Sequence, residues 1–166
     1  MTAEPHAPED SQTAPVVEAP KRHRARASGP DVRVGVFLDV ANLSGAARRV
    51  FHGSIDFRQL LSTLVAGRRL IEARAYAIDK GQGFQGFAQA LRQIGYRVYS
   101  KKPKTFSDGS TKADWDVGIT VDVLTLFEKL DVVVLGSGDG DFTPVVEALQ
   151  RRGVLVEVAA FRERSA

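Results

Sequence analysis

The acidic residues best suited to chemistry stand directly after apolar runs of the sequence. Asp39 follows the run 34–38, and Asp139 and Asp141 follow the run 132–135 in the short segment Ser-Gly-Asp-Gly-Asp. Ligands of open parallel sheets bind beyond the carboxyl ends of the strands, where the order of winding reverses. If the two runs form neighbouring strands, these three carboxylates lie in one cleft.

Several carboxylates in one cleft repel one another and raise one another's pKa unless they share a cation. Mg²⁺ or Mn²⁺ is the expected ion, because both are hard cations that take oxygen ligands and retain several waters. Gly138 and Gly140 allow the tight turn that directs two carboxylates toward one point. Ser137 and Asn42 are candidates for orienting a ligand or a water, and Asn42 is equally suited to cap the helix that follows it.

Three further acids, Asp114, Asp116 and Asp122, lie in or next to a segment with helical periodicity. Ordinary structural interpretations exist for most of the acids. Asp114 and Asp116 suit a helix N-terminus, Asp141 suits an N-cap, and Asp-Gly is common in turns. These interpretations do not explain an acid such as Asp39 at the end of an apolar strand. Which of Asp114, Asp116 and Asp122 is the ligand stays open, and Asp122 is also a candidate for a buried polar link.

The elements that must position these acids follow from the hydrophobic periodicity. Five nearly continuous apolar runs predict strands at 34–38, 70–78, 96–100, 132–135 and 154–159. Helical spacing predicts helices over 56–65, 84–94, 115–130 and 142–151. Apolar strands that alternate with helices indicate an α/β fold whose mostly parallel, five-stranded sheet is covered by helices on both faces. We expect the strand order 3-2-1-4-5.

The first thirty residues differ in composition from the remainder of the chain. They hold five of the seven prolines and no aromatic residue. Such a segment cannot bury enough surface to offset the entropy lost on ordering it. We expect a disordered tail over 1–30, one domain over 31–162 and a short C-terminal end over 163–166. The basic stretch 21–26 is interpreted as a solvated linker, with contact to a nucleic-acid backbone as the alternative.

Composition excludes several classes of protein. The chain of 166 residues has no cysteine, which removes thiol nucleophiles and Cys-based zinc sites, and its three histidines have no metal-ligand spacing. No apolar run approaches the ~20 residues of a membrane span, so we expect a soluble, cytoplasmic protein. The net charge of +3 permits a polyanionic partner without requiring one.

Three segments of the sequence resemble the motifs of NYN domains, a family of the PIN-like nuclease superfamily. They are Val36–Leu43, Lys112–Asp122 and Ser137–Phe142, and they occur in the family's order. The resemblance covers residues 33–160 and implies a Rossmann-like PIN fold with divalent-metal-dependent cleavage of RNA. Carried over by position, it implies a catalytic Mg²⁺ or Mn²⁺ site in which Asn42 lies beside four acids: Asp39, Asp116, Asp139 and Asp141.

Lysines and aromatic residues lie close together after the third predicted strand. The candidates for substrate binding are Asn42 and the four lysines of this segment, with Phe106 as an aromatic neighbour: Lys101, Lys102, Lys104 and Lys112. Cations contact phosphates and rings stack on bases, so this segment suits single-stranded RNA. The alternative is that the lysines only solvate a loop. Pro103 and Gly109 predict a mobile connection over 103–111.

The first hypothesis for function is a metal-dependent ribonuclease in which two ions, about 3.5–4 Å apart, orient a water for attack on phosphorus. The alternative is a catalytically weak or inactive PIN-like module that binds RNA or a protein. A nucleotide-binding protein has less support, because the turn after the first strand lacks a Gly-rich phosphate loop. The sequence leaves monomer and homodimer both open.

Overall fold

Strand β2 (Arg33–Asp39) is the central strand of the sheet. In the computed structural model, which describes residues 17–18 and 27–161, β2 lies between β3 and β7 and is parallel to both. The parallel strands follow the order β4-β3-β2-β7-β8, which is 3-2-1-4-5 by occurrence along the chain. The predicted α/β fold and strand order are therefore confirmed. The other four parallel strands are β3 (Arg69–Ile78), β4 (Arg97–Lys101), β7 (Val132–Gly136) and β8 (Leu155–Ala159).

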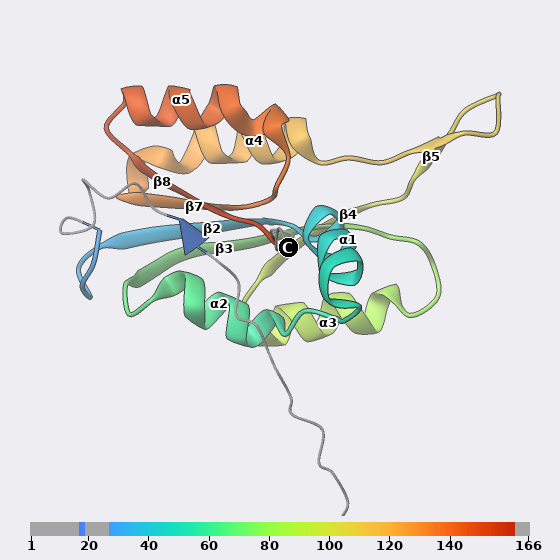
Figure 1. Cartoon of the computed structure of the whole chain (residues 1–166), viewed down its shortest axis with the longest axis horizontal. Helices are drawn as coiled ribbons and strands as arrows, with labels where there is room; N and C mark the ends of the chain where they lie inside the picture. The colour runs from blue at the N-terminus through green and yellow to red at the C-terminus, as the bar shows by residue number, and fades with distance from the viewer. Residues whose placement is uncertain (1–16, 19–26, 162–166) are drawn as a thin grey trace, which may run out of the picture.

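Side chains of β2 alternate between two hydrophobic cores, one on each face of the sheet. Val36 and Leu38 pack with α1, α2 and α3 on one face, whereas Phe37 packs with α4 and α5 on the other (Figure 1). Burial of both faces explains why the strands are nearly continuously apolar. No helix in the described residues is long and apolar enough to cross a membrane. The helices are α1 (Val40–Phe51), α2 (Phe57–Val65), α3 (Phe84–Ile94), α4 (Asp116–Leu126) and α5 (Thr143–Arg151).

Two predicted segments differ from the structure. The helix predicted over 115–130 ends at Leu126 as α4 and continues as a short 3₁₀ turn, η2 (Phe127–Lys129). The connection predicted over 103–111 contains a second, two-stranded antiparallel sheet, made by β5 (Lys104–Thr105) and β6 (Thr111–Lys112). Its turn is closed by hydrogen bonds from Phe106 N to Ser110 O and from Gly109 N to Phe106 O. These turn hydrogen bonds bring β5 and β6 together, although the polar sequence of the segment gives only a weak signal for strands.

The predicted tail over 1–30 lies largely outside the described residues, and the domain boundaries stay a prediction. Where this segment is described, it contacts the domain. Strand β1 (Val17–Glu18) pairs antiparallel with the edge strand β8. Ala27 is buried, and its carbonyl oxygen accepts a hydrogen bond from the guanidinium of Arg68. Both contacts are made by backbone groups, which need no apolar side chains for pairing, and the tail over 1–30 stays a prediction.

Candidate metal centre

Two neighbouring strands of the sheet, β2 and β7, direct acidic residues to its carboxyl edge. Asp39 ends β2, and its Oδ1 accepts a hydrogen bond of 3.1 Å from the backbone N–H of Asn42, which makes Asp39 the N-cap of α1. The alternative role of Asn42 as the cap of this helix is therefore wrong. After β7, Asp139 caps the 3₁₀ turn η3 (Gly140–Phe142), because its Oδ1 accepts a hydrogen bond of 2.9 Å from the backbone N–H of Asp141.

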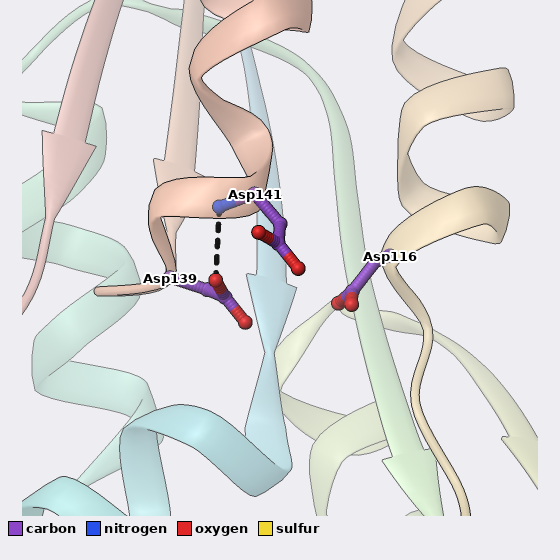
Figure 2. Close-up of side chains that lie close together, drawn as sticks. All are labelled: Asp116, Asp139 and Asp141. Atoms are coloured by element: carbon purple, nitrogen blue, oxygen red, sulfur yellow. Dashed lines mark hydrogen bonds between the residues drawn. The ribbon is translucent and has the colours of Figure 1, made fainter.

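Three carboxylates converge beyond this edge of the sheet. Figure 2 shows Asp139 and Asp141, from the loop after β7, directed toward Asp116, the first residue of α4. Each residue offers one carboxylate oxygen, and these oxygens all lie within 4.8 Å of one another. Asp116 is partly buried and Asp141 is exposed. The structure thus brings together residues that lie 23 and 25 positions apart along the chain.

Asp39 lies next to this group, although it is not a member of it. Its residue is only 8% exposed, and burial is the main influence that raises the pKa of its carboxyl group. The charges of Asp139 and Asp114 raise this pKa further, whereas backbone N–H groups of Ala41 and Asn42 lower it. The pKa of Asp116 is raised by burial and by the charges of four aspartates: Asp114, Asp139, Asp39 and Asp141.

The three converging acids have no cationic partner among the described residues. None of the ion pairs there includes Asp116, Asp139 or Asp141. By contrast, Asp114 lies 3.4 Å from Lys112 Nζ, and Asp122 lies 2.7 Å from Arg74 Nη1. Of the three acids that the sequence leaves open, only Asp116 belongs to the converging group.

Helix α4 is held on the sheet by a polar network that the sequence analysis missed, apart from Asp122. The hydroxyl of Tyr76 donates a hydrogen bond of 2.6 Å to Asp122, which also accepts from buried Arg74. Burial, and then the bond to Asp122, raises the pKa of Tyr76. The available signal was an arginine inside the apolar strand 70–78, which needs a buried acid as its partner.

The beginning of α4 is fixed by Trp115. The indole Nε1–H donates a hydrogen bond of 2.8 Å to the carbonyl of Ala77 in β3. The ring also lies against Gly118, where an added Cβ would be 2.8 Å from Cε3 of the indole. Because Asp116 is the next residue, these contacts set the position from which its carboxylate meets the loop after β7.

Comparison with known proteins identifies the family of this chain. The family model of the NYN domain matches residues 33–166. The chain belongs to the NYN domain family. NYN domains are members of the PIN-like nuclease superfamily, so the resemblance stated from the sequence is confirmed.

Two relatives of this NYN domain show how far the similarity extends. The low amplitude and bright protein LabA of Synechococcus elongatus is 30% identical over 138 residues, which cover 77% of this chain and 73% of LabA. A crystal structure of a Vibrio parahaemolyticus protein of unknown function is 34% identical, with a TM-score of 0.70. That match covers 78% of this chain and 81% of the Vibrio chain.

The residues expected to bind substrate occupy two places in the NYN domain. Asn42 links helix α1 to the loop after β7, because its Oδ1 accepts a hydrogen bond of 2.9 Å from Gly138 N. The four predicted lysines are exposed and lie at the end of β4 and on the β5–β6 hairpin: Lys101, Lys102, Lys104 and Lys112. Lys101 Nζ lies 4.5 Å from the ring centroid of Trp115, so it packs at the base of this hairpin.

Proposed function

We propose that this NYN domain is a divalent-metal-dependent ribonuclease. The observation that carries the proposal is the convergence of Asp116, Asp139 and Asp141, whose oxygens lie within 4.8 Å of one another without a cationic neighbour in the described residues. Like charges at this distance favour a shared cation. Membership of the PIN-like nuclease superfamily supports phosphodiester hydrolysis as the chemistry.

The residues present fit Mg²⁺ or Mn²⁺. Carboxylate oxygens are the ligands that these hard cations prefer, and the group contains no thiolate or imidazole that would favour a softer ion. Asp116, Asp139 and Asp141 are the proposed ligands, and Asp39 adds a fourth carboxylate at the end of β2. A bound ion of this kind supplies an activated water and stabilises the charge that develops on the leaving oxygen.

The chain's own contribution is to hold these acids in place before the ion binds. The bond from Asp141 N to Asp139 Oδ1 fixes one oxygen of Asp139 and leaves its second oxygen for a ligand. The bond from Gly138 N to Asn42 Oδ1 fixes the loop relative to α1. Asn42 is thereby a positioning residue for the loop that carries Asp139.

The test is a cleavage assay on end-labelled single-stranded and duplex RNA, with Mn²⁺, with Mg²⁺ and with a chelator. We expect cleavage only with metal, and a loss of at least about 100-fold in rate for Asp139→Asn, because a ligand is removed while the turn is retained. Asp31→Asn is the matched control, since this exposed acid precedes β2 at the opposite edge of the sheet.

Two results would contradict the proposal. One is equal cleavage by wild type and Asp139→Asn, which would indicate a contaminating nuclease. The other is metal and RNA binding without cleavage under any of these conditions, which would favour a non-catalytic binding module.

A further inference from the structure

The segment 101–112, here called the basic arm, joins β4 to the beginning of α4. Its β5–β6 hairpin extends away from the sheet (Figure 1). The arm contains four lysines and one acid, Asp108, and so carries a net charge of +3. The single acid is engaged in the turn, where it accepts hydrogen bonds from the backbone N–H and the hydroxyl of Ser110.

Packing of the domain does not account for the arm. None of its residues is buried, and neither hydrophobic core includes any of them. Phe106, its one aromatic residue, is 50% exposed. A two-stranded hairpin alone is at best marginally stable in water. An exposed aromatic ring and a concentration of charge on such an element indicate a binding role more than a structural one.

The register of the hairpin places like charges opposite each other. Lys104 pairs with Lys112 across the two strands. Opposed residues of an antiparallel pair lie on the same face, and like charges there are destabilising. Lys112 also meets Asp114 at 3.4 Å, but the Lys112 side chain remains 75% exposed, so this pair neutralises it weakly. A polyanion on this face relieves the repulsion.

Both ends of the arm lie at the edge of the sheet that carries the acids. Lys101 ends β4, and its carbonyl accepts a hydrogen bond of 2.9 Å from Asp79 N, just after the end of β3. At the other end, Lys112 precedes Asp116 by four residues. A chain of phosphates along the arm therefore leads to the converging carboxylates. An exposed ring such as Phe106 stacks on the unpaired bases of a single strand, which a duplex does not offer.

We propose that the basic arm binds a single strand of RNA, with lysines on the phosphates and Phe106 on a base. The choice of RNA rests on the proposed function. The binding itself requires no metal and no cleavage, because none of the converging acids belongs to the arm.

The experiment measures anisotropy of a labelled 15-nucleotide single-stranded RNA in chelator, with all proteins in an Asp139→Asn background. The arm variant combines Lys102→Ala, Lys104→Ala and Lys112→Ala. Loss of three phosphate contacts lowers the affinity about 100-fold at 0.1 M salt and reduces the slope of log K against log salt by about 2. Phe106→Ala lowers the affinity about tenfold and leaves the slope unchanged.

The matched control removes three basic residues at the opposite edge of the sheet: Arg92→Ala, Lys129→Ala and Arg151→Ala. These residues are exposed and lie in the last turns of the elements that precede β4, β7 and β8, so RNA affinity stays within about twofold of the parent. Equal losses in the arm variant and the control overturn the proposal, as does duplex RNA that binds as tightly as the single strand. Unchanged RNA affinity in the arm variant also overturns it and favours an acidic protein surface as the partner.

The RNA-binding experiment and the cleavage assay test the two proposals separately. RNA binding that depends on the arm, together with an absence of cleavage, supports the arm and contradicts the ribonuclease. Cleavage without dependence on the arm does the reverse.

Discussion

Helix α4 carries two aspartates six residues apart, Asp116 and Asp122, in opposite electrostatic surroundings. Asp122 lies against the guanidinium of Arg74 and accepts a hydrogen bond from the Tyr76 hydroxyl. Among the described residues, the charges that act on Asp116 come from other acids, and together with burial they raise its pKa. The same residue type thus ties the helix to the sheet at one position and lies among like charges at the other. The sign of the neighbouring charges separates these two roles.

We expect the largest loss of stability when the contacts of Asp122 with Arg74 and Tyr76 are broken. Asp122→Ala removes the acceptor of the Tyr76 hydroxyl and, among the described acids, leaves Arg74 with Glu72 alone, whose Oε2 lies 3.3 Å from the Arg74 Nε. We expect the free energy of unfolding to fall by roughly 2–3 kcal/mol, less than for a fully buried pair because the Asp122 side chain is 29% exposed. Urea denaturation at pH 7 measures this loss.

The control for this variant is Asp122→Asn, which keeps an acceptor for the Tyr76 hydroxyl but removes the charge opposite Arg74. Its loss of stability should be smaller than that of Asp122→Ala. If Asp122→Ala unfolds at the same urea concentration as wild type, the network does not hold α4, and the contrast with Asp116 fails.

A substitution among the converging acids should not lower the stability of the metal-free protein. Asp139→Asn removes one of the repelling charges and keeps an oxygen for the bond from Asp141 N, so metal-free stability stays equal or rises by up to about 1 kcal/mol. In wild type, Mn²⁺ at 100 times its Kd adds about 2.7 kcal/mol, and this gain is largely lost in the variant. Thermal melts with and without Mn²⁺ measure both effects, with Asp31→Asn as the control. If Mn²⁺ raises the melting temperatures of wild type and Asp139→Asn by the same amount, the proposed metal site is wrong.

We expect the smallest effect on stability from the exposed ion pair between Arg33 and Asp131. Arg33 Nη2 lies 2.9 Å from Asp131 Oδ1, and hydrogen bonds from Arg33 lower the pKa of Asp131 below 3.8. A carboxyl group whose pKa is lowered by folding stabilises the protein above its unfolded pKa, and this contribution is lost as the pH falls through the folded pKa. Asp131→Asn should lower the melting temperature by only about 1–2 °C at pH 7. The difference from wild type should begin to shrink as the pH falls below the ordinary aspartate pKa of 3.8 and should disappear once the pH is below the lowered pKa of Asp131; a constant difference across this range would rule out the ion pair as its cause.

Much of the fold could be predicted because hydrophobic periodicity and the winding rules of parallel sheets are local and general properties. The same rules placed Asp39 and Asp139 at one edge, since both follow apolar strands. Periodicity could not choose between Asp114, Asp116 and Asp122. That choice depends on Lys112 and Arg74, whose approach to the acids is created only by tertiary structure.

Other features escaped prediction because they depend on backbone hydrogen bonds. The strands β5 and β6 consist of polar, exposed residues that give no periodic signal. The cap of α1 is Asp39, although Asn42 is also a residue type that caps helices. Only the geometry of the chain at the end of β2 distinguishes them.

The central position of β2 also constrains how this protein is made. β2 is the first of the parallel strands to be synthesised, but its partner β7 begins at Val132, and the bond between Arg33 and Asp131 spans 98 residues. Pairing at such separation forms slowly. During translation, one edge of β2 therefore stays unpaired until the residues of β7 have left the ribosome, which exposes it to association with other nascent chains. Asp139 and Asp141 follow β7, so the acidic centre is among the last parts of the domain to be assembled.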